Sequence, residues 1–367
     1  MNDINNKIFQ PVKIKNLELS NRIAMAPMTR GFSPNGIPGE NVAAYYRRRA
    51  EAGVGLIITE GTVVNHLASA GTNNVPTIYG EKALAGWRRV VQEVHEVGGR
   101  IIPQIWHVGY MRKKGIYPNP EVPGYGPVEI RNEEGVDTIG MTDQDIDTVI
   151  TAFASAAKNA KDVGFDGLEI HGAHEYLIDQ FLWEKSNLRD DSYGGTAEKR
   201  MNFALDIVRA IREAVGPDFL VVFRFSQWKQ KDYKAKLASS PLDLEKFLIP
   251  LTEAGVDVFH ASTRRFWEPE FEGSDLNLAG WAKKITGKPS ITVGSVGLDA
   301  EFISTWGGKT ANPTGIDGLL ERLDKDEFDL VAVGRAILAD PDWVEKIKQG
   351  RLDEIVPFSK TALEQLI

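Results

Sequence analysis

Short apolar segments alternate along this chain with longer stretches in which apolar residues recur every three or four positions. The short segments predict eight strands, at residues 22–26, 55–59, 100–106, 167–170, 220–225, 256–260, 290–293 and 330–333. The longer stretches predict helices at residues 40–52, 81–97, 142–163, 196–215, 242–254, 276–285, 315–323 and 340–349, with Thr142 and Thr196 as helix starts. Apolar strands that alternate with helices indicate a parallel sheet that is buried on both faces.

Eight strand–helix units predict an α/β fold of the (β/α)8 TIM-barrel type. An open doubly wound sheet is the alternative, but its Gly-x-Gly-x-x-Gly turn is missing where the first strand ends, at residues 26–29. Residues 11–20 alternate as in a small N-terminal hairpin. Residues 109–140 are rich in glycine and proline and have no helical period, which predicts a capping insertion after the third strand. We therefore expect a single domain over residues 1–367.

Composition narrows the classes of function. With 42% hydrophobic and 26% charged residues, the chain is typical of a soluble globular protein. It has no cysteine, which excludes disulfides, thiolate zinc sites, cysteine nucleophiles and iron–sulfur clusters. A net charge of −8 argues against a nucleic-acid partner. Without a long apolar run or an N-terminal signal, we expect a cytoplasmic protein with no membrane partner.

Candidate chemistry gathers directly after the fourth predicted strand. His171, His174 and Tyr176 follow that strand, and active sites of barrels lie at the carboxyl ends of the strands. Two imidazoles and a phenol can polarise a carbonyl and deliver a proton. None of them can supply a hydride, so a redox reaction here needs a cofactor. The two histidines have no third ligand nearby, and we predict no metal site.

Other strand ends carry polar or small residues. Gln104 and Trp106 share one face of the third strand, Arg224 lies among apolar neighbours in the fifth, and Gly61 follows the second. A buried polar side chain needs a partner, which for Arg224 is either a carboxylate or a bound anion. Trp106 by itself is as compatible with core packing as with a ligand pocket.

A phosphate site is predicted after the last two strands. Gly294, Ser295 and Val296 follow the seventh strand, and Gly334 and Arg335 follow the eighth. In barrels these two loops commonly bind phosphate, which points to a mononucleotide or a phosphorylated ligand. Residues 307–310, Gly-Gly-Lys-Thr, imitate the end of a phosphate loop but lack its first glycine, so they predict a surface loop.

These motifs together resemble the Old Yellow Enzyme family of FMN-dependent ene-reductases. The resemblance spans about residues 8–350. It is strongest at His171, His174 and Tyr176, in the Asn-x-Arg-x-Asp-x-Tyr-Gly-Gly run at 187–195, in residues 21–30, and after the eighth strand. The loops at 227–241 and 263–273 match least, so the choice of substrate is left open.

The resemblance implies noncovalent FMN, NADPH or NADH as reductant, an activated alkene as substrate, and the N-terminal hairpin as the floor of the barrel. Nitrate esters are further substrates to expect, and a homodimer is one assembly it allows. Implied cofactor contacts are Ala26, Pro27, Met28, Thr29, Gly61, Gln104, His171, Arg224, Gly294, Ser295, Val296, Gly334 and Arg335. In the family, the histidine pair holds the substrate oxygen and the tyrosine protonates carbon. Implied substrate contacts are therefore His171, His174, Tyr176, Trp106 and either Phe266 or Trp267.

Two other functions stay open at this point. A phosphosugar aldolase or isomerase would use the same barrel and phosphate site, with Glu169 as the only acid that faces the interior. A flavin-binding sensor would hold FMN without turnover.

Overall fold

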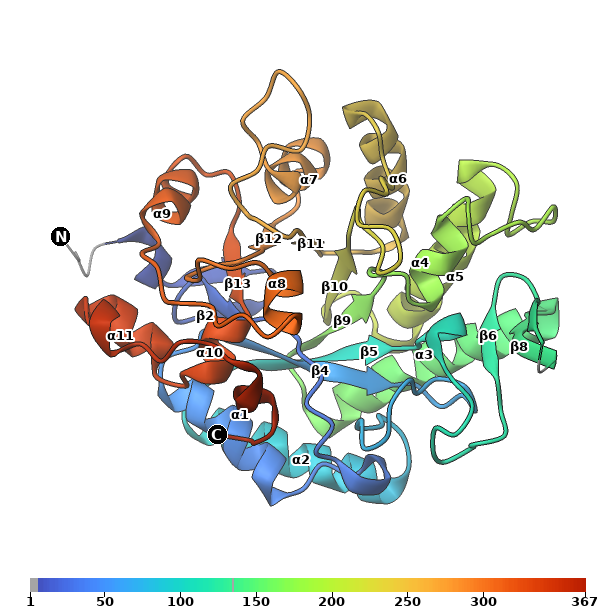
Figure 1. Cartoon of the computed structure of the whole chain (residues 1–367), viewed down its shortest axis with the longest axis horizontal. Coiled ribbons are helices and arrows are strands. Elements are labelled where there is room, and N and C mark those ends of the chain that lie inside the picture. Colours follow the sequence, from blue (N-terminus) through green and yellow to red (C-terminus); the bar gives the residue numbers. More distant parts are fainter. Residues whose placement is uncertain (1–5, 134) are drawn as a thin grey trace.

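The computed structural model describes residues 6–133 and 135–367. Its centre is a closed barrel of eight parallel strands, ringed by helices (Figure 1), which confirms the predicted fold class. Around the barrel the order is β10-β11-β12-β13-β3-β4-β5-β9. The strands are β3 (Ile23–Met25), β4 (Leu56–Val63), β5 (Ile101–Trp106), β9 (Gly167–His171), β10 (Leu220–Phe225), β11 (Val258–Ser262), β12 (Ser290–Val293) and β13 (Leu330–Val333).

Most helices lie close to their predicted positions, and the predicted start signals act as caps. Thr142 accepts a hydrogen bond from Asp145 in a reciprocal capping box, and Thr196 accepts one from Lys199. The short helices α4, α8 and α10 were not predicted. The helices are α1 (Glu40–Glu51), α2 (Glu81–Glu96), α3 (Asp143–Val163), α4 (Leu177–Leu182), α5 (Ala197–Val215), α6 (Pro241–Ala254), α7 (Leu278–Thr286), α8 (Phe302–Trp306), α9 (Asp317–Asp324), α10 (Arg335–Ala339) and α11 (Trp343–Gln349).

The N-terminal hairpin closes the bottom of the barrel. Its strands β1 (Val12–Ile14) and β2 (Leu17–Leu19) pair antiparallel. Ile14, Leu17 and Leu19 pack against inward residues from the barrel strands. Fully burying one such side chain contributes about 1.5–3 kcal/mol to the stability of the fold. The packed apolar side chains close this end of the barrel. Chemistry is therefore confined to the opposite end of the strands.

Two strands differ from the prediction in ways that matter at the rim. β4 was predicted to end at residue 59 but continues to Val63. A register shift between Ile58 and Gly61 accommodates residues 59–62, whose polar sequence resembles a loop. β11 lies two residues later than predicted. Its predicted first residue, Val256, instead caps α6 by bonding to Leu251 O, and the shift brings Ser262 to the rim.

The described part of the insertion after β5 forms secondary structure of its own. It holds a small sheet of β6 (Gly124–Gly126), β8 (Gly135–Gly140) and β7 (Ile130–Asn132), in that order. In Figure 1, β6 and β8 lie to one side of the barrel. The Arg189 guanidinium donates to Pro127 O and Met141 O, so the 187–195 run holds this insertion and does not line the cavity at the barrel rim.

Candidate active site

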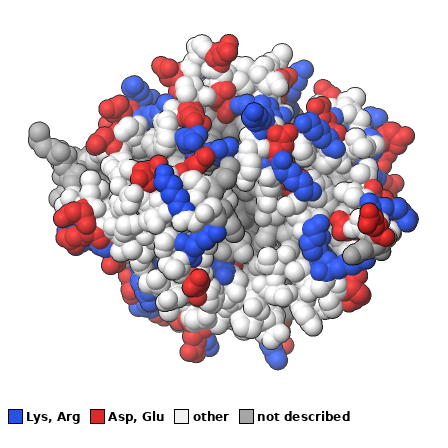
Figure 2. All heavy atoms as spheres, viewed as in Figure 1, with Lys and Arg blue, Asp and Glu red and all other residues white. Residues whose placement is uncertain are grey.

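A cavity of about 700 Å³ opens at the carboxyl ends of the barrel strands. Figure 2 shows this face hollowed near its centre, with lysine and arginine side chains around the hollow. The structure brings together residues from every barrel strand end named in the sequence analysis. The predicted residues that line the cavity are Ala26, Pro27, Met28, Thr29, Gly61, Gln104, Trp106, His171, His174, Tyr176, Arg224, Gly294, Ser295, Val296, Gly334 and Arg335.

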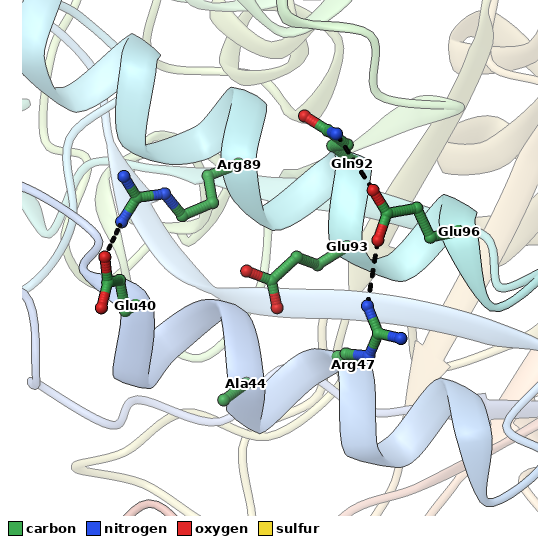
Figure 3. A pocket seen from close by; sticks show the side chains of 7 residues that line it. All are labelled: Glu40, Ala44, Arg47, Arg89, Gln92, Glu93 and Glu96. Carbon is green, nitrogen blue, oxygen red and sulfur yellow. Dashed lines mark hydrogen bonds and ion pairs between the residues drawn. The ribbon is translucent and has the colours of Figure 1, made fainter.

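A second hollow, of similar size, lies on the outside of the barrel between α1 and α2 (Figure 3). Its charges pair across the two helices, Arg89 with Glu40 at 2.8 Å and Arg47 with Glu96 at 3.1 Å. It contains no strand end and no histidine. The cavity at the rim is therefore the candidate active site.

The rim cavity is cationic although the chain carries a net charge of −8. Arg30, Arg224, Arg264, Arg335 and Lys360 line it, and the described lining residues include no aspartate or glutamate, although Arg264 pairs with Glu301, which does not line the cavity. A cavity of one sign concentrates ligands of the other sign. The site therefore favours an anionic ligand.

One end of the cavity suits a phosphate. Arg335 donates to Thr305 Oγ1 at 3.1 Å and to Ala300 O at 2.8 Å, which fixes its guanidinium. Burial lowers the pKa of Arg335 to about 10, so it stays charged at neutral pH. Gly294 has φ +149°, and a Cβ there would lie 2.7 Å from Thr263 Oγ1, so the loop needs glycine.

Arg224 lies deeper, and only 6% of it is exposed. Its Nη2 is 3.4 Å from Ser262 Oγ, and its Nε has no hydrogen-bond partner among the described residues. Within the same residues it forms no ion pair with a carboxylate. Because a buried guanidinium without a counterion is costly, the arrangement favours a bound anion over the salt-bridge alternative.

Below the cavity lies a polar layer. Gln104 Nε2 donates to Glu169 Oε1 at 2.7 Å, and His260 Nδ1 is 2.6 Å from Glu169 Oε2. Glu169 is thus the polar partner that an inward Gln104 requires. Both oxygens of this buried carboxylate are occupied, and Glu169 does not line the cavity. Glu169, the acid that an aldolase or isomerase would need, is therefore not accessible from the cavity.

His171, His174 and Tyr176 form one cluster above this layer. The ring centroids of His171 are 5.1 Å from His174 and 4.8 Å from Tyr176. His174 has φ +63°, a left-handed conformation that is unfavourable for a residue with a Cβ. Its amide donates to Ser226 Oγ at 3.1 Å, which helps to hold that turn. Chain reversal within the turn brings the three side chains together.

Both histidines are neutral donors at pH 7. Burial, and then the charge of Arg224, place the pKa of His171 and of His174 well below the usual value. His171 Nδ1 accepts from Ala173 N at 3.4 Å, so we assign the proton to Nε2. His174 Nε2 lies 2.7 Å from Ser262 Oγ, and the hydroxyl can either donate to this nitrogen or accept from it, so the imidazole proton is on Nδ1 in the tautomer where Ser262 donates.

Tyr176 stays protonated for the same physical reason. Burial raises its pKa above the ordinary value near 10. Its ring packs edge-on against Trp106 with centroids 4.9 Å apart. The Trp106 ring in turn occupies the space where a Cβ on residue 61 would sit, 2.5 Å from Trp106 Cε3, so this packing requires Gly61.

One prediction is wrong in its placement. Neither Phe266 nor Trp267 lines the cavity. Phe266 donates its amide hydrogen to Gly294 O, and its side chain is buried in the core. Trp267 packs edge-on against Phe266 and is 43% exposed.

One side of the cavity is lined by residues that the sequence analysis did not identify. Trp228, Gln230 and Tyr233 come from the loop after β10, and Arg264 comes from the loop after β11. The sequence feature that could have pointed to the loop after β10 is the presence of aromatic residues in a lysine-rich segment. No period or motif indicated which side chains turn inward. The tail contributes Phe358, Lys360 and Leu363.

The comparisons with known proteins agree with this geometry. Residues 7–354 match the NADH:flavin oxidoreductase / NADH oxidase family. NADH oxidase from Thermoanaerobacter brockii is 35% identical over 95% of this chain and 52% of its own length. The Arabidopsis thaliana 12-oxophytodienoate reductase 2 is 33% identical over 93% of this chain and 88% of its own. Morphinone reductase, solved with tetrahydroNAD, is 27% identical with a TM-score of 0.80 over 97% of this chain and 93% of its own.

The chain therefore belongs to the NADH:flavin oxidoreductase / NADH oxidase family, which confirms the resemblance to Old Yellow Enzymes. Membership also confirms FMN as the cofactor. The chain spans about half the length of the Thermoanaerobacter relative.

The described residues fit an FMN. The fixed Arg335 beside Gly294 and Gly334 suits its phosphate, and the unpaired Nε of Arg224 suits negative charge on its ring. The described residues contain no group of three or more histidines, cysteines or acids arranged to hold a metal ion. Across the same residues, no helix combines the length and apolar character needed to cross a membrane.

Proposed function

We propose that this protein is an NAD(P)H-dependent ene-reductase that reduces activated C=C bonds, namely α,β-unsaturated carbonyls and nitroalkenes. Nitrate esters are proposed as side substrates. The observation that carries the proposal is the cluster of His171, His174 and Tyr176, which combines two neutral N–H donors with a protonated phenol in a cavity that suits FMN.

When bound, FMN would supply the hydride-transfer chemistry that links the nicotinamide to the alkene. The chain positions the substrate and handles the proton. His171 Nε2–H and His174 Nδ1–H hold the carbonyl or nitro oxygen and stabilise the negative charge that develops there. Tyr176 donates its phenolic proton to the carbon next to the activating group, and bulk solvent restores it. Trp106 supports the tyrosine ring from the side.

Arg224 is proposed to favour the anionic reduced state of the cofactor. It is buried, permanently charged and lacks a carboxylate partner among the described residues, so an added electron pair nearby is stabilised by its field. Gln104, held by Glu169, is proposed to bind the polar edge of the ring.

The visible absorption spectrum of the purified protein tests this proposal. We expect a flavin spectrum that bleaches with anaerobic NADH or NADPH and returns when cyclohexenone is added. A flavin that bleaches but ignores cyclohexenone and nitrostyrene would leave a flavin reductase with another acceptor. A protein that binds FMN and is never reduced would support the sensor alternative.

NADH and NADPH are compared in the same experiment, because the sequence left the preference between them open.

A homodimer, a single domain over residues 1–367 and a cytoplasmic location stay predictions. Analytical ultracentrifugation tests the homodimer.

A further inference from the structure

The wall of the cavity rests on a fully buried ion pair. Lys229 Nζ lies 2.5 Å from Asp179 Oδ1, and neither side chain has any solvent exposure. Desolvating two charges costs several kcal/mol for each ion, and a buried pair often adds nothing to stability relative to apolar residues. Burial raises the pKa of Asp179, which reflects that cost. This cost indicates that the pair has a role other than stabilising the fold.

The pair joins the two segments that build the substrate side of the site. Asp179 is in α4, three residues after Tyr176. Its second oxygen, Oδ2, accepts from the amide of Glu175 at 2.7 Å, so it also holds the left-handed turn that contains His174. Lys229 belongs to the loop after β10, next to Trp228.

Glu175 adds a second tie between the same segments. It has φ +63° and a side chain with no exposure, an unfavourable setting for a carboxylate. Its Oε1 accepts from Tyr110 OH at 2.6 Å, and its Oε2 accepts from Lys231 N at 2.8 Å. The loop after β10 is thus fastened at residues 229 and 231, on either side of Gln230, which lines the cavity.

The fastened loop presents a stack of flat groups to the cavity. Trp228 lies on His174 with centroids 4.4 Å apart and planes 20° from parallel. Tyr233 stacks on Trp228 at 5.4 Å, and the Arg264 guanidinium lies 5.1 Å above the Tyr233 ring. Trp228 therefore limits the orientation of His174 together with the hydrogen bond between His174 Nε2 and Ser262 Oγ.

We propose that the Lys229–Asp179 pair is a positioning element for the reaction: it locks the loop after β10 against α4, which holds Trp228 flat on His174 and aims that imidazole at the substrate oxygen. The role rests on the function proposed above. Lys229 and Asp179 touch neither substrate nor cofactor, and they act through Trp228 and the 174–175 turn.

The test compares Lys229→Met with the double variant Lys229→Met/Asp179→Asn, both with FMN. The single variant leaves a buried carboxylate unpaired, whereas the double variant removes both charges and keeps an oxygen for the Glu175 amide. Lys15→Met is the matched control, because it removes a lysine from a pair with Asp257 at the opposite end of the barrel. Lys15→Met is expected to behave as the unmodified protein in every assay below.

The first readout is tryptic cleavage after Lys231, Lys234 and Lys236, which are exposed on the loop. Release of the loop is expected to raise cleavage about tenfold in both variants. This assay needs no flavin or turnover, so it tests the lock even if the proposed function fails. Cleavage that is unchanged in the double variant would overturn the proposal.

The second readout is binding of 4-hydroxybenzaldehyde, a flat phenol whose oxygen competes for the histidine pair, followed by the flavin spectrum. We expect about threefold to tenfold weaker binding and a higher KM for cyclohexenone in both variants, the range expected when the Trp228 stack on His174 is lost. FMN affinity and bleaching by NADH should change less than about twofold. If the double variant binds the phenol normally, the defect came from the unpaired charge and the positioning role is wrong.

Discussion

The floor of the cavity and its outer wall are held in different ways. Gln104, His171 and Arg224 of the floor come from barrel strands, where the hydrogen-bonded ladder sets the direction of each side chain. Trp228 and Tyr233 of the wall come from a loop and are placed by side-chain contacts, which include the buried Lys229–Asp179 pair and the hydrogen bond from Trp228 Nε1 to Ser262 O. We infer that the floor serves chemistry and cofactor binding, and that the wall selects substrates.

The largest effect is expected at Tyr176. Tyr176→Phe removes the proton donor but keeps the ring that packs on Trp106. Oxidation of the reduced flavin by cyclohexenone should slow about 10²- to 10⁴-fold, while reduction by NADH is largely unchanged. Stopped-flow measurement of both half-reactions checks this. Equal slowing of both would assign the tyrosine a general structural role.

A smaller effect is expected at the phosphate end of the cavity. Arg335→Gln removes a fixed charge and should weaken FMN binding about 10- to 100-fold, because hydrogen bonds to charged groups contribute about 1.5–3 kcal/mol. Fluorescence titration of the apoprotein with FMN measures the affinity. Lys309→Gln, in the exposed 307–310 loop that imitates a phosphate motif, should leave it unchanged. An effect at Lys309 would reverse the assignment.

The wall should respond more weakly and in a different property. Trp228→Leu removes the stack on His174, and such aromatic pairs contribute about 0.5–1.5 kcal/mol beyond area burial. We expect binding of 4-hydroxybenzaldehyde to weaken about threefold to tenfold with FMN affinity unchanged. Trp267→Leu is the control, because Trp267 lies outside the cavity. A larger effect from Trp267 than from Trp228 would contradict the placement of both loops.

The smallest expected effect concerns pH. The pKa of His171 and of His174 is lowered well below 6.5 by burial, and the pKa of Tyr176 is raised above 10. Neither histidine gains a proton and the tyrosine loses none between pH 6 and 8, so the rate of enone reduction by the reduced flavin should vary less than about twofold. A rate that rises as the pH falls through 6.5 would show that a histidine takes up a proton there.

Many residues of the site could be predicted because they lie at or directly after the ends of strands. Once β9 and β10 are recognised, alternation places His171 and Arg224 inside the barrel without further information. The bulge in β4 and the two-residue shift of β11 could not be predicted, because Glu60 and Asp257 each use a carboxylate to bond backbone amides of segments distant in sequence. Ser262, which orients His174, was missed for that reason.

The sequence by itself determined the barrel, the order of its units and the chemical groups at the strand ends, since these depend on local periods and short motifs. Only the tertiary structure decided which loop residues face the cavity, placing Trp228 and Arg264 there and Phe266 and Trp267 elsewhere. The physical reason is that a loop has no repeating geometry to orient its side chains. Their direction is set by long-range contacts such as Lys229 with Asp179, fifty residues apart.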